Sequence, residues 1–172
     1  MNILKILHVV RGLRHSSGTT TTVVPLSEQQ ARLGHKVVIY FVEQGSEAPM
    51  LPDPRLVETR CFPMSLPFWH PGISIEFARA MHATVRDHDV IHIHAIWNFP
   101  TWWAMRAAVR TGVPYVVSPQ GSFEPWALRQ GGWRKARYGR LAEIPLMNRA
   151  AFMQALTTTE AEQFRAGGVR AP

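Results

Sequence analysis

Three loops of this 172-residue chain carry residue types that suit sugar or phosphate binding, and the first follows an apolar run near the start. Ser17, Gly18 and Thr19 stand there before a predicted helix, whose free backbone N–H groups would bind phosphate or sugar hydroxyls. A plain capped turn has the same composition. A Walker loop is excluded, because Gly12 and Gly18 are one residue too far apart and Thr19 replaces its lysine. The dinucleotide fingerprint G-x-G-x-x-G is absent as well.

Two histidines mark the second loop. His92 and His94 are two apart on a predicted strand at 90–94, so they share one face. His94 ends that strand and could hydrogen-bond a sugar hydroxyl or a phosphate, whereas we interpret His92 as a satisfied core residue. Metal sites usually need three or four ligands, and the nearby cysteine and carboxylates lack ligand spacing, so the sequence predicts no metal site.

The third loop combines polar, flexible and aromatic residues over positions 118–126. Gln120 offers both a donor and an acceptor, Gly121 would let a backbone approach a ligand closely, and Trp126 offers an apolar face. This mixture suits a neutral polyol. It is equally compatible with a turn that starts a helix.

Alternating elements must position these loops. The predicted strands span 3–10, 36–42, 56–62, 90–94, 114–118 and 156–158, and the predicted helices span 20–33, 74–87, 102–111, about 133–151 and 159–166. Pro25 requires that its helix begin near Val24 or kink, and Pro145 interrupts the long helix. Thr159 and Glu162 form the capping box of the last helix.

Strands alternating with helices predict right-handed crossovers and a parallel sheet covered on both faces. We therefore expect a single three-layer, Rossmann-like α/β domain over residues 1–172 with a mainly parallel central sheet. Ligands bind beyond the carboxyl ends of such strands, where the strand order reverses. In the usual order, the loops at 11–19 and 95–100 are neighbours there.

Composition bounds the cellular setting. The chain is 46% hydrophobic with a net charge of +7, which indicates an anionic partner. A single cysteine, Cys61, and the lack of a signal-peptide pattern at the start favour the cytoplasm. No apolar run approaches the roughly 20 residues that span a bilayer, so membrane contact would be peripheral.

The candidate membrane-facing residues are Arg134, Lys135 and Arg137, which lie in a basic segment interleaved with aromatic residues. Such a helix could lie on anionic lipid at the inner face of the membrane. Contact with another domain of the protein and a merely solvated face are the alternatives. A nucleic-acid partner is not favoured, because no base-reading motif accompanies the charge.

Four segments in register resemble the N-terminal domain of GT-B glycosyltransferases, the two-domain enzymes called glycosyltransferase group one. They read SSGTTTTVVPLSEQQARLGHKVVIYF, DVIHIHAIWN, GVPYVVSPQGSFEPWAL and ALTTTEAEQFRAGGVRAP. The resemblance implies one half of a GT-B fold, with a second, nucleotide-sugar-binding domain absent from this chain. It implies sugar transfer from a nucleotide sugar to a glycan or lipid-linked acceptor with retention, and an isolated domain that is inactive.

The resemblance also implies site residues. The glycine loop, here Ser17, Gly18 and Thr19, would line the acceptor and donor-phosphate cleft. His94 matches the family's HxH strand end. A family histidine is replaced by Gln120, which could still bind a hydroxyl.

Gly121, Glu124 and Trp126 would then help to hold the acceptor. Neither a metal nor a further cofactor is expected. The alternative interpretations are a non-enzymatic module that binds glycans or anions, and half of a sugar-nucleotide epimerase on the same architecture.

Overall fold

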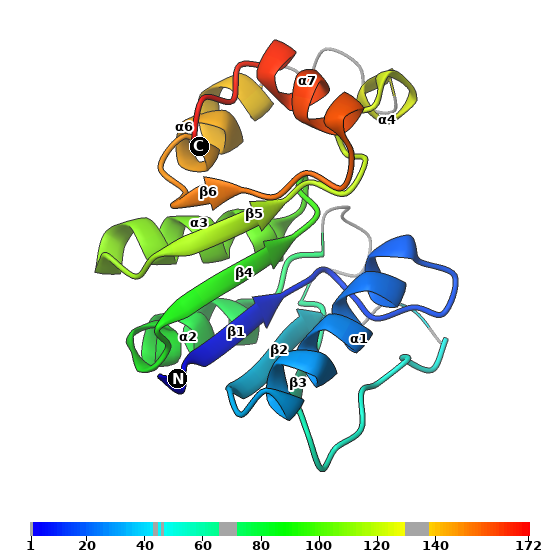
Figure 1. Cartoon of the computed structure of the whole chain (residues 1–172), viewed down its shortest axis with the longest axis vertical. Helices are drawn as coiled ribbons and strands as arrows, with labels where there is room; N and C mark the ends of the chain where they lie inside the picture. Colours follow the sequence, from blue (N-terminus) through cyan, green and yellow to red (C-terminus); the bar gives the residue numbers. More distant parts are fainter. Residues whose placement is uncertain (1, 43–44, 46, 66–71, 130–137) are drawn as a thin grey trace.

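The computed structural model describes residues 2–42, 45, 47–65, 72–129 and 138–172, and it is built on one central sheet (Figure 1). The described strands pair in the order β3-β2-β1-β4-β5-β6, and every pairing is parallel. Their bounds are β1 Lys5–Val9, β2 Lys36–Val42, β3 Glu58–Phe62, β4 Val90–His94, β5 Tyr115–Ser118 and β6 Phe152–Met153. This is the predicted Rossmann-like sheet, with its order reversing between β1 and β4.

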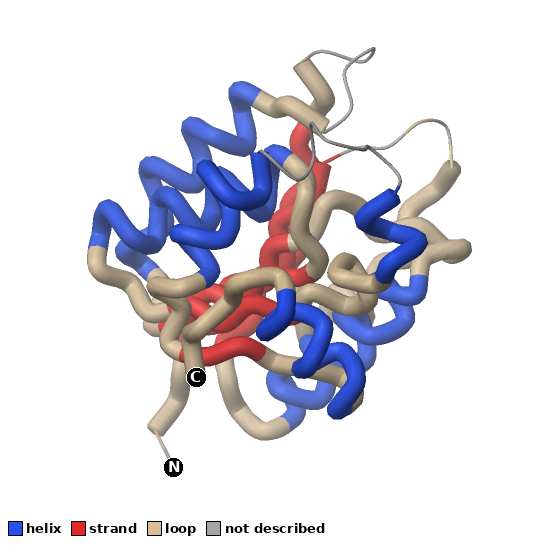
Figure 2. The backbone as a smooth tube through the Cα atoms, turned by 90° about the horizontal axis from the view of Figure 1, so that it is seen from above, coloured by secondary structure: helices blue, strands red, loops and turns tan. Residues whose placement is uncertain are grey.

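Helices alternate with the strands along the chain. Figure 2 shows that they lie on both sides of the sheet. Their bounds are α1 Gly18–Arg32, α2 Ile75–Thr84, the 3₁₀ turn η1 Val85–Asp87, α3 Phe99–Thr111, α4 Pro125–Arg129, the π-helical η2 Gly139–Glu143, α6 Ile144–Met147 and α7 Thr158–Ala166. Among the described residues, no helix is long and apolar enough to cross a membrane.

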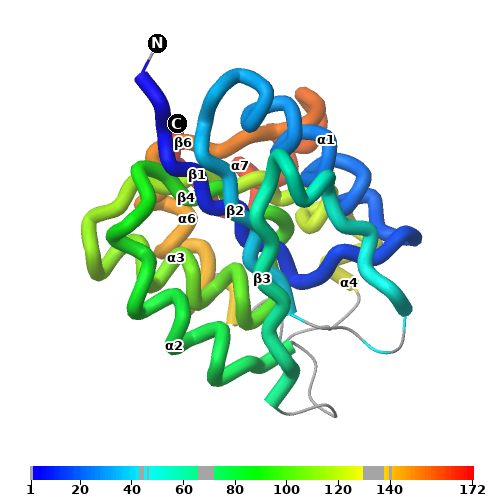
Figure 3. Tube along the Cα trace, turned by 90° about the horizontal axis from the view of Figure 1, so that it is seen from below, coloured from blue at the N-terminus to red at the C-terminus, as the bar shows by residue number. Residues whose placement is uncertain are grey.

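The sheet separates two cores, and Figure 3 shows α1 on one side with α2 and α3 on the other. Alternate residues of β1 point to opposite faces, so Ile6 joins the core under α1 while Leu7 joins the larger core under α2 and α3. The same alternation places His8, His92 and His94 on the α1 side, because Ile91 and Ile93 pack in the larger core.

Helix α1 begins earlier than the sequence indicates. It starts at Gly18, ahead of the predicted Thr20, and runs through Pro25, so of the two alternatives for this proline a start near Val24 is wrong. The proline removes the donor that would reach the carbonyl of Thr21. Both Pro25 and Thr21 are exposed, and water can therefore bond that carbonyl.

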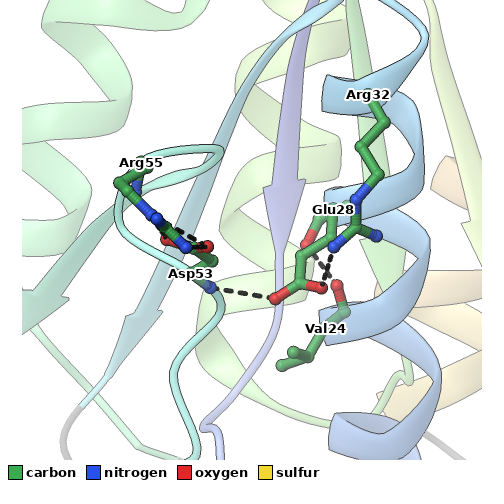
Figure 4. A network of polar contacts seen from close by, with 6 residues as sticks. Val24, Glu28, Arg32, Asp53 and Arg55 are labelled. Carbon is green, nitrogen blue, oxygen red and sulfur yellow. Dashed lines mark hydrogen bonds and ion pairs between the residues drawn. The ribbon is translucent and has the colours of Figure 1, made fainter.

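A polar network ties the proline-rich segment before β3 to α1 (Figure 4). Glu28 Oε1 accepts the backbone N–H of Asp53 at 2.9 Å, and its other oxygen lies 3.3 Å from Arg32 Nη2. Arg55 pairs with Asp53 at 2.7 Å, and its side-chain hydrogen bonds lower the pKa of that carboxyl to about 2. The segment that leads into the edge strand is thereby fixed against the helix.

The last third of the chain departs most from expectation. The strand predicted at 156–158 lies instead at Phe152–Met153, because Ala151 and Gln154 donate to the carbonyls of Tyr115 and Val117. The N–H of Leu156 bonds Glu160 and cannot join a ladder.

Both predicted helices in this region are also corrected. Within the described residues, the long helix expected to reach Ala151 ends at Met147, with Pro145 tolerated in the first turn of α6. Helix α7 is capped by Thr157, whose side chain accepts from the N–H of Glu160, and not by the predicted Thr159.

Candidate functional site

A cavity of about 380 Å³ lies at the reversal point between β1 and β4. The loops after these two strands line it, as their predicted proximity requires. The lining residues are Val10, Arg11, Gly12, Arg14, Ser16, Ser17 and Thr19 from the first loop, and Ala95, Ile96, Trp97 and Asn98 from the second. Ser17 and Thr19 are thus brought together with the residue that follows His94.

The first loop gives the cavity a cationic, hydroxyl-rich wall. Ser17 is the N-cap of α1 and does not use its hydroxyl to cap the helix, whose first turn contains no acidic residue. Arg14 pairs with Glu47 at 3.0 Å. The pKa of Arg11 is lowered, mainly because the side chain is partly buried and secondly because the positive charge of Arg14 is close. Two arginines beside a positive helix terminus suit an anion such as a phosphate.

The structure around Gly18 gives no steric or conformational reason for a glycine. A Cβ atom built on it would meet nothing within 4 Å, and its φ lies outside the left-handed region. The backbone therefore does not require glycine here. A small side chain would leave the fold unchanged, and Gly18 itself does not line the cavity, although its neighbours Ser17 and Thr19 do.

The second loop is held in a strained conformation. Ala95 and Trp97 have φ values of 61° and 65°, a region that costs a non-glycine residue on the order of 1 kcal/mol or more. Ala95 donates its N–H to Ser118 at 2.8 Å, and Trp97 donates its own to Glu143 Oε2 at 2.9 Å. Such strain persists where surrounding contacts over-determine it, and it is typical of functional loops.

Trp97 is a cavity-lining residue that the sequence analysis missed. Its indole Nε1–H donates to Ser122 at 2.9 Å, and its ring packs edge-on against Phe123 at 5.7 Å between centroids. A Cβ on Gly139 would lie 2.5 Å from this ring, so only glycine allows η2 to pack here. Trp97 therefore joins the second and third loops.

The third loop makes a tight turn at the end of β5. Gln120 and Gly121 have φ values of 52° and 79°, and Ser122 donates its N–H to Pro119 at 3.2 Å, which is the pattern of a type I′ turn. Glu160 holds this turn, because its Oε1 accepts the N–H of Gly121 at 2.7 Å. Glu160 is not among the candidate residues that the sequence analysis identified.

The remaining predicted acceptor residues lie apart from the cavity. Trp126 is 56% exposed at the start of α4, and its indole N–H donates to Glu124. Neither residue lines the cavity, and of the other predicted residues at the ends of β4 and β5, His94, Gln120 and Gly121 do not line it either. Arg134, Lys135 and Arg137 lie outside the described residues.

A buried histidine cluster, defined as His8, His92 and His94, lies behind the rim of the site on the α1 face of the sheet. His94 Nε2 lies 2.8 Å from His8 Nδ1, and its Nδ1 lies 3.3 Å from Gln120 Nε2. His92 Nε2 lies 2.8 Å from Ser118 Oγ, so it is a hydrogen-bonded core residue as predicted.

Burial keeps the histidine cluster neutral. It lowers the pKa of His8 to about 4 and that of His92 to about 3, and it holds the pKa of His94 well below its usual range. His94 and Gln120, predicted as neighbours of the reacting sugar, are therefore in direct contact, with a neutral imidazole behind the amide.

The cluster also has the composition of a three-ligand metal site. The candidate ligand atoms of the three side chains lie within 4.8 Å of one another. His8 is the third ligand that the sequence analysis lacked, since its register partner on β4 is His92. Both ring nitrogens of His8 and of His94 are already hydrogen-bonded, so an ion would have to displace these bonds.

Comparisons with known proteins agree with this fold. A family model described as a glycosyl transferase 4-like domain matches residues 17–172. Among solved structures, Anabaena HepE in complex with UDP and glucose has a TM-score of 0.65 at 16% identity, over 98% of this chain and 42% of that one.

Two further structures share the fold. A putative UDP-N-acetylglucosamine 2-epimerase from Listeria monocytogenes has a TM-score of 0.61 at 9% identity, over 97% of this chain and 42% of that one. An alpha-glucosyltransferase in complex with UDP and DNA has a TM-score of 0.56 at 14% identity, over 90% of this chain and 38% of that one. The chain therefore spans less than half the length of these structures. No curated protein matches the chain.

Proposed function

The chain belongs to the glycosyl transferase 4-like domain family, and we propose that it is the acceptor-side half of an enzyme that moves a sugar from a nucleotide sugar to a glycan or lipid-linked acceptor, with retention. The observation that carries this proposal is the cavity between the β1 and β4 loops. His94 and Gln120 contact each other at the ends of β4 and β5, on the same edge of the sheet, although neither of them lines the cavity. The donor would be held mainly by a second domain of the full protein.

The two walls of the site would divide the work. Arg11, Arg14 and the N-terminus of α1 would stabilise the negative charge of the departing diphosphate, which is electrostatic preorganisation. Gln120 would position an acceptor hydroxyl in line with the sugar. This proposal includes no metal and no cofactor beyond the donor, because these groups supply the positive charge.

We assign His94 a positioning role and not proton transfer. Its ring is fully buried, both nitrogens are hydrogen-bonded, and its pKa is held well below neutrality by desolvation. A general base needs a pKa near the working pH and an accessible lone pair. Gln120, which touches His94 and is half-buried, is the better candidate for substrate contact.

The experiment is a nucleotide-release assay on the protein with its donor domain, using UDP-sugars and candidate acceptors. Gly18→Trp should reduce turnover at least tenfold, because the indole would be attached between Ser17 and Thr19, which line the cavity. Gly18→Ala is the matched control and should retain activity, since its Cβ has open space. Turnover that Gly18→Trp leaves intact would remove the role assigned to this loop.

A sugar-nucleotide epimerase is the second candidate, and the shared fold of the Listeria enzyme favours it. The same assay separates the two functions. A transferase releases nucleotide only in proportion to acceptor, whereas an epimerase converts the nucleotide sugar without acceptor. A module that only binds glycans or anions would do neither.

Peripheral membrane binding is a separate proposal that rests on the sequence of Arg134, Lys135 and Arg137. Each cation near an anionic surface contributes about 1 kcal/mol, so replacing all three by serine should abolish flotation with anionic liposomes. Arg79→Ser, at an exposed position of α2, is the control. Flotation that survives the triple change would exclude this surface.

A further inference from the structure

We propose that Gln30 and His8 are positioning residues of this site: with His94 they form a directional hydrogen-bond chain that turns the amide oxygen of Gln120 toward the ligand, so that Gln120 accepts a hydrogen bond from a sugar hydroxyl. The inference deepens the proposed function and rests on it for the identity of the ligand. The hydrogen bonds themselves do not depend on the proposed function.

The contacts run without a break from α1 to the third loop. Gln30 Oε1, on α1, lies 2.7 Å from His8 Nε2 on β1. His8 Nδ1 lies 2.8 Å from His94 Nε2 on β4, and His94 Nδ1 lies 3.3 Å from Gln120 Nε2. The two imidazoles stack at 5.1 Å between centroids with an interplanar angle of 20°. Three secondary-structure elements therefore converge on one amide.

The chemistry of the two ends fixes the direction of the chain. The Gln120 amide nitrogen can only donate, so His94 Nδ1 must accept. A neutral imidazole then carries its proton on Nε2, and His94 donates to His8 Nδ1. His8 must in turn donate from Nε2, and its partner is Gln30 Oε1, which can only accept. The direction deduced from the Gln120 amide is therefore the same as the one that the Gln30 oxygen requires.

Neutrality of both rings is a condition of this chain, because an imidazolium has two donors and no acceptor. Both rings are fully buried, and desolvation lowers the pKa of His8 to about 4 and holds that of His94 well below its usual range. The His8 pKa is also raised by its bond to Gln30, but burial is the larger effect. At neutral pH the tautomers are therefore fixed by the hydrogen bonds.

The consequence falls on Gln120 Oε1. This atom is inaccessible to solvent and has no hydrogen-bond partner among the described residues. A buried acceptor without a donor is uncommon and is completed by a ligand group or an ordered water. Because the oxygen can only accept, it selects an O–H or N–H group and disfavours a phosphate oxygen. Gln120 does not line the cavity that contains Arg11 and Arg14, so this oxygen would bind a hydroxyl apart from the anion that those arginines suit.

The first test measures tautomers directly, by ¹⁵N NMR of the imidazoles in the 172-residue chain. His8 and His94 should both be neutral and protonated at Nε2. Gln30→Leu removes the acceptor of the His8 Nε2 proton and should therefore shift the imidazole signals of His8, while Gln30→Glu, which keeps an acceptor, should keep that proton hydrogen-bonded. Gln29→Leu, exposed on the same helix, is the matched control and should change nothing.

Three results would overturn the inference. They are a His94 protonated at Nδ1, histidine signals that Gln30→Leu leaves unchanged, and displacement of the Nε2 protons by added Zn²⁺, which would make the cluster a metal site. The wild-type spectrum alone decides the first, so the test does not depend on how well the variants fold.

The second test uses two small probes on the same chain. Millimolar D-glucose should shift the side-chain amide signals of Gln120, whereas inorganic phosphate should shift the backbone signals of residues 16–19 and leave Gln120 unchanged. Phosphate, and not glucose, moving the Gln120 amide would refute the assignment of its oxygen as the ligand-facing atom.

Kinetics in the two-domain protein link the chain to turnover. Loss of one net hydrogen bond should raise KM for the acceptor up to about tenfold in Gln30→Leu, with KM for the donor unchanged and rescue in Gln30→Glu. An equal loss for donor and acceptor would overturn the positioning role. The tautomer result stands even if no transferase activity is found, so failure of the proposed function and failure of this inference are distinguishable.

Discussion

Replacing Glu160 by glutamine should loosen the third loop without changing the shape of the side chain. The Glu160 carboxylate is 5% exposed and accepts two backbone N–H groups, from Gly121 and Leu156, each at 2.7 Å. A carboxylate offers two acceptor oxygens, whereas the glutamine amide offers one oxygen and one NH₂ group. One of the two N–H groups would then face another donor.

The expected cost follows from these contacts. A hydrogen bond to a charged acceptor contributes about 1.5–3 kcal/mol, and the lost bond is only partly offset because Leu156 is exposed and its N–H can bind water. The loss of negative charge from the first turn of α7 adds a few tenths of a kcal/mol. We expect Glu160→Gln to lower the free energy of unfolding by about 2 kcal/mol, or Tm by roughly 4–8 °C for a chain of this size.

Urea unfolding measures this change, with Glu162→Gln as the control because Glu162 is exposed on the same helix. Glu160→Ala should cost at least as much as Glu160→Gln, since it removes both acceptors. If Glu160→Gln and Glu162→Gln unfold at the same urea concentration, the two-acceptor explanation is wrong and the loop is held by packing instead.

Two further predictions concern packing and pH. Gly139→Ala should destabilise the fold by about 1–3 kcal/mol, because its Cβ would lie 2.5 Å from the ring of Trp97. Gly18→Ala is the control and should leave stability unchanged. Equal urea midpoints for the two variants would refute the tight packing at Gly139. Above about pH 6.5 the cluster histidines are neutral in both the folded and the unfolded chain, so they should not change the free energy of unfolding with pH. Below that pH the free energy of unfolding should fall, because the unfolded chain takes up protons before the folded one, whose His8 pKa is about 4. Each histidine should contribute about 1.4 kcal/mol per pH unit in that window, and urea midpoints that stay constant down to about pH 5 would contradict the lowered pKa values.

Much of the fold could be predicted from the sequence because the buried strands are locally unmistakable. The runs at 36–42 and 90–94 are apolar and branched, and the structure has strands at the same bounds. The last third could not, because Thr157–Glu160 and Thr159–Glu162 both fit a capping box. The choice between them is made by Gly121, far away in sequence, whose N–H needs the carboxylate of Glu160.

The site was less predictable than the fold. The proximity of the loops after β1 and β4 followed from the order of elements, and Ser17 and Thr19 do line the cavity there. His8 could not be identified from the sequence, because it stands in an apolar run and only the strand register places it beside His92. Gln30 is likewise an ordinary helix residue until His8 faces it. Such residues are visible only once the strands are paired.

The backbone supplies an independent reason to place the site at this rim. The non-glycine residues with positive φ, among those described, are Ala95, Trp97 and Gln120, and all three follow β4 or β5. Glycine would relieve the strain at each position. Trp97 instead packs its ring against Phe123 and Gln120 donates its amide N–H to His94, so these two positions use a side chain that the backbone alone would disfavour. Local rules are broken mainly where a side chain is needed for function, and the strain therefore marks Trp97 and Gln120 as the residues to substitute first.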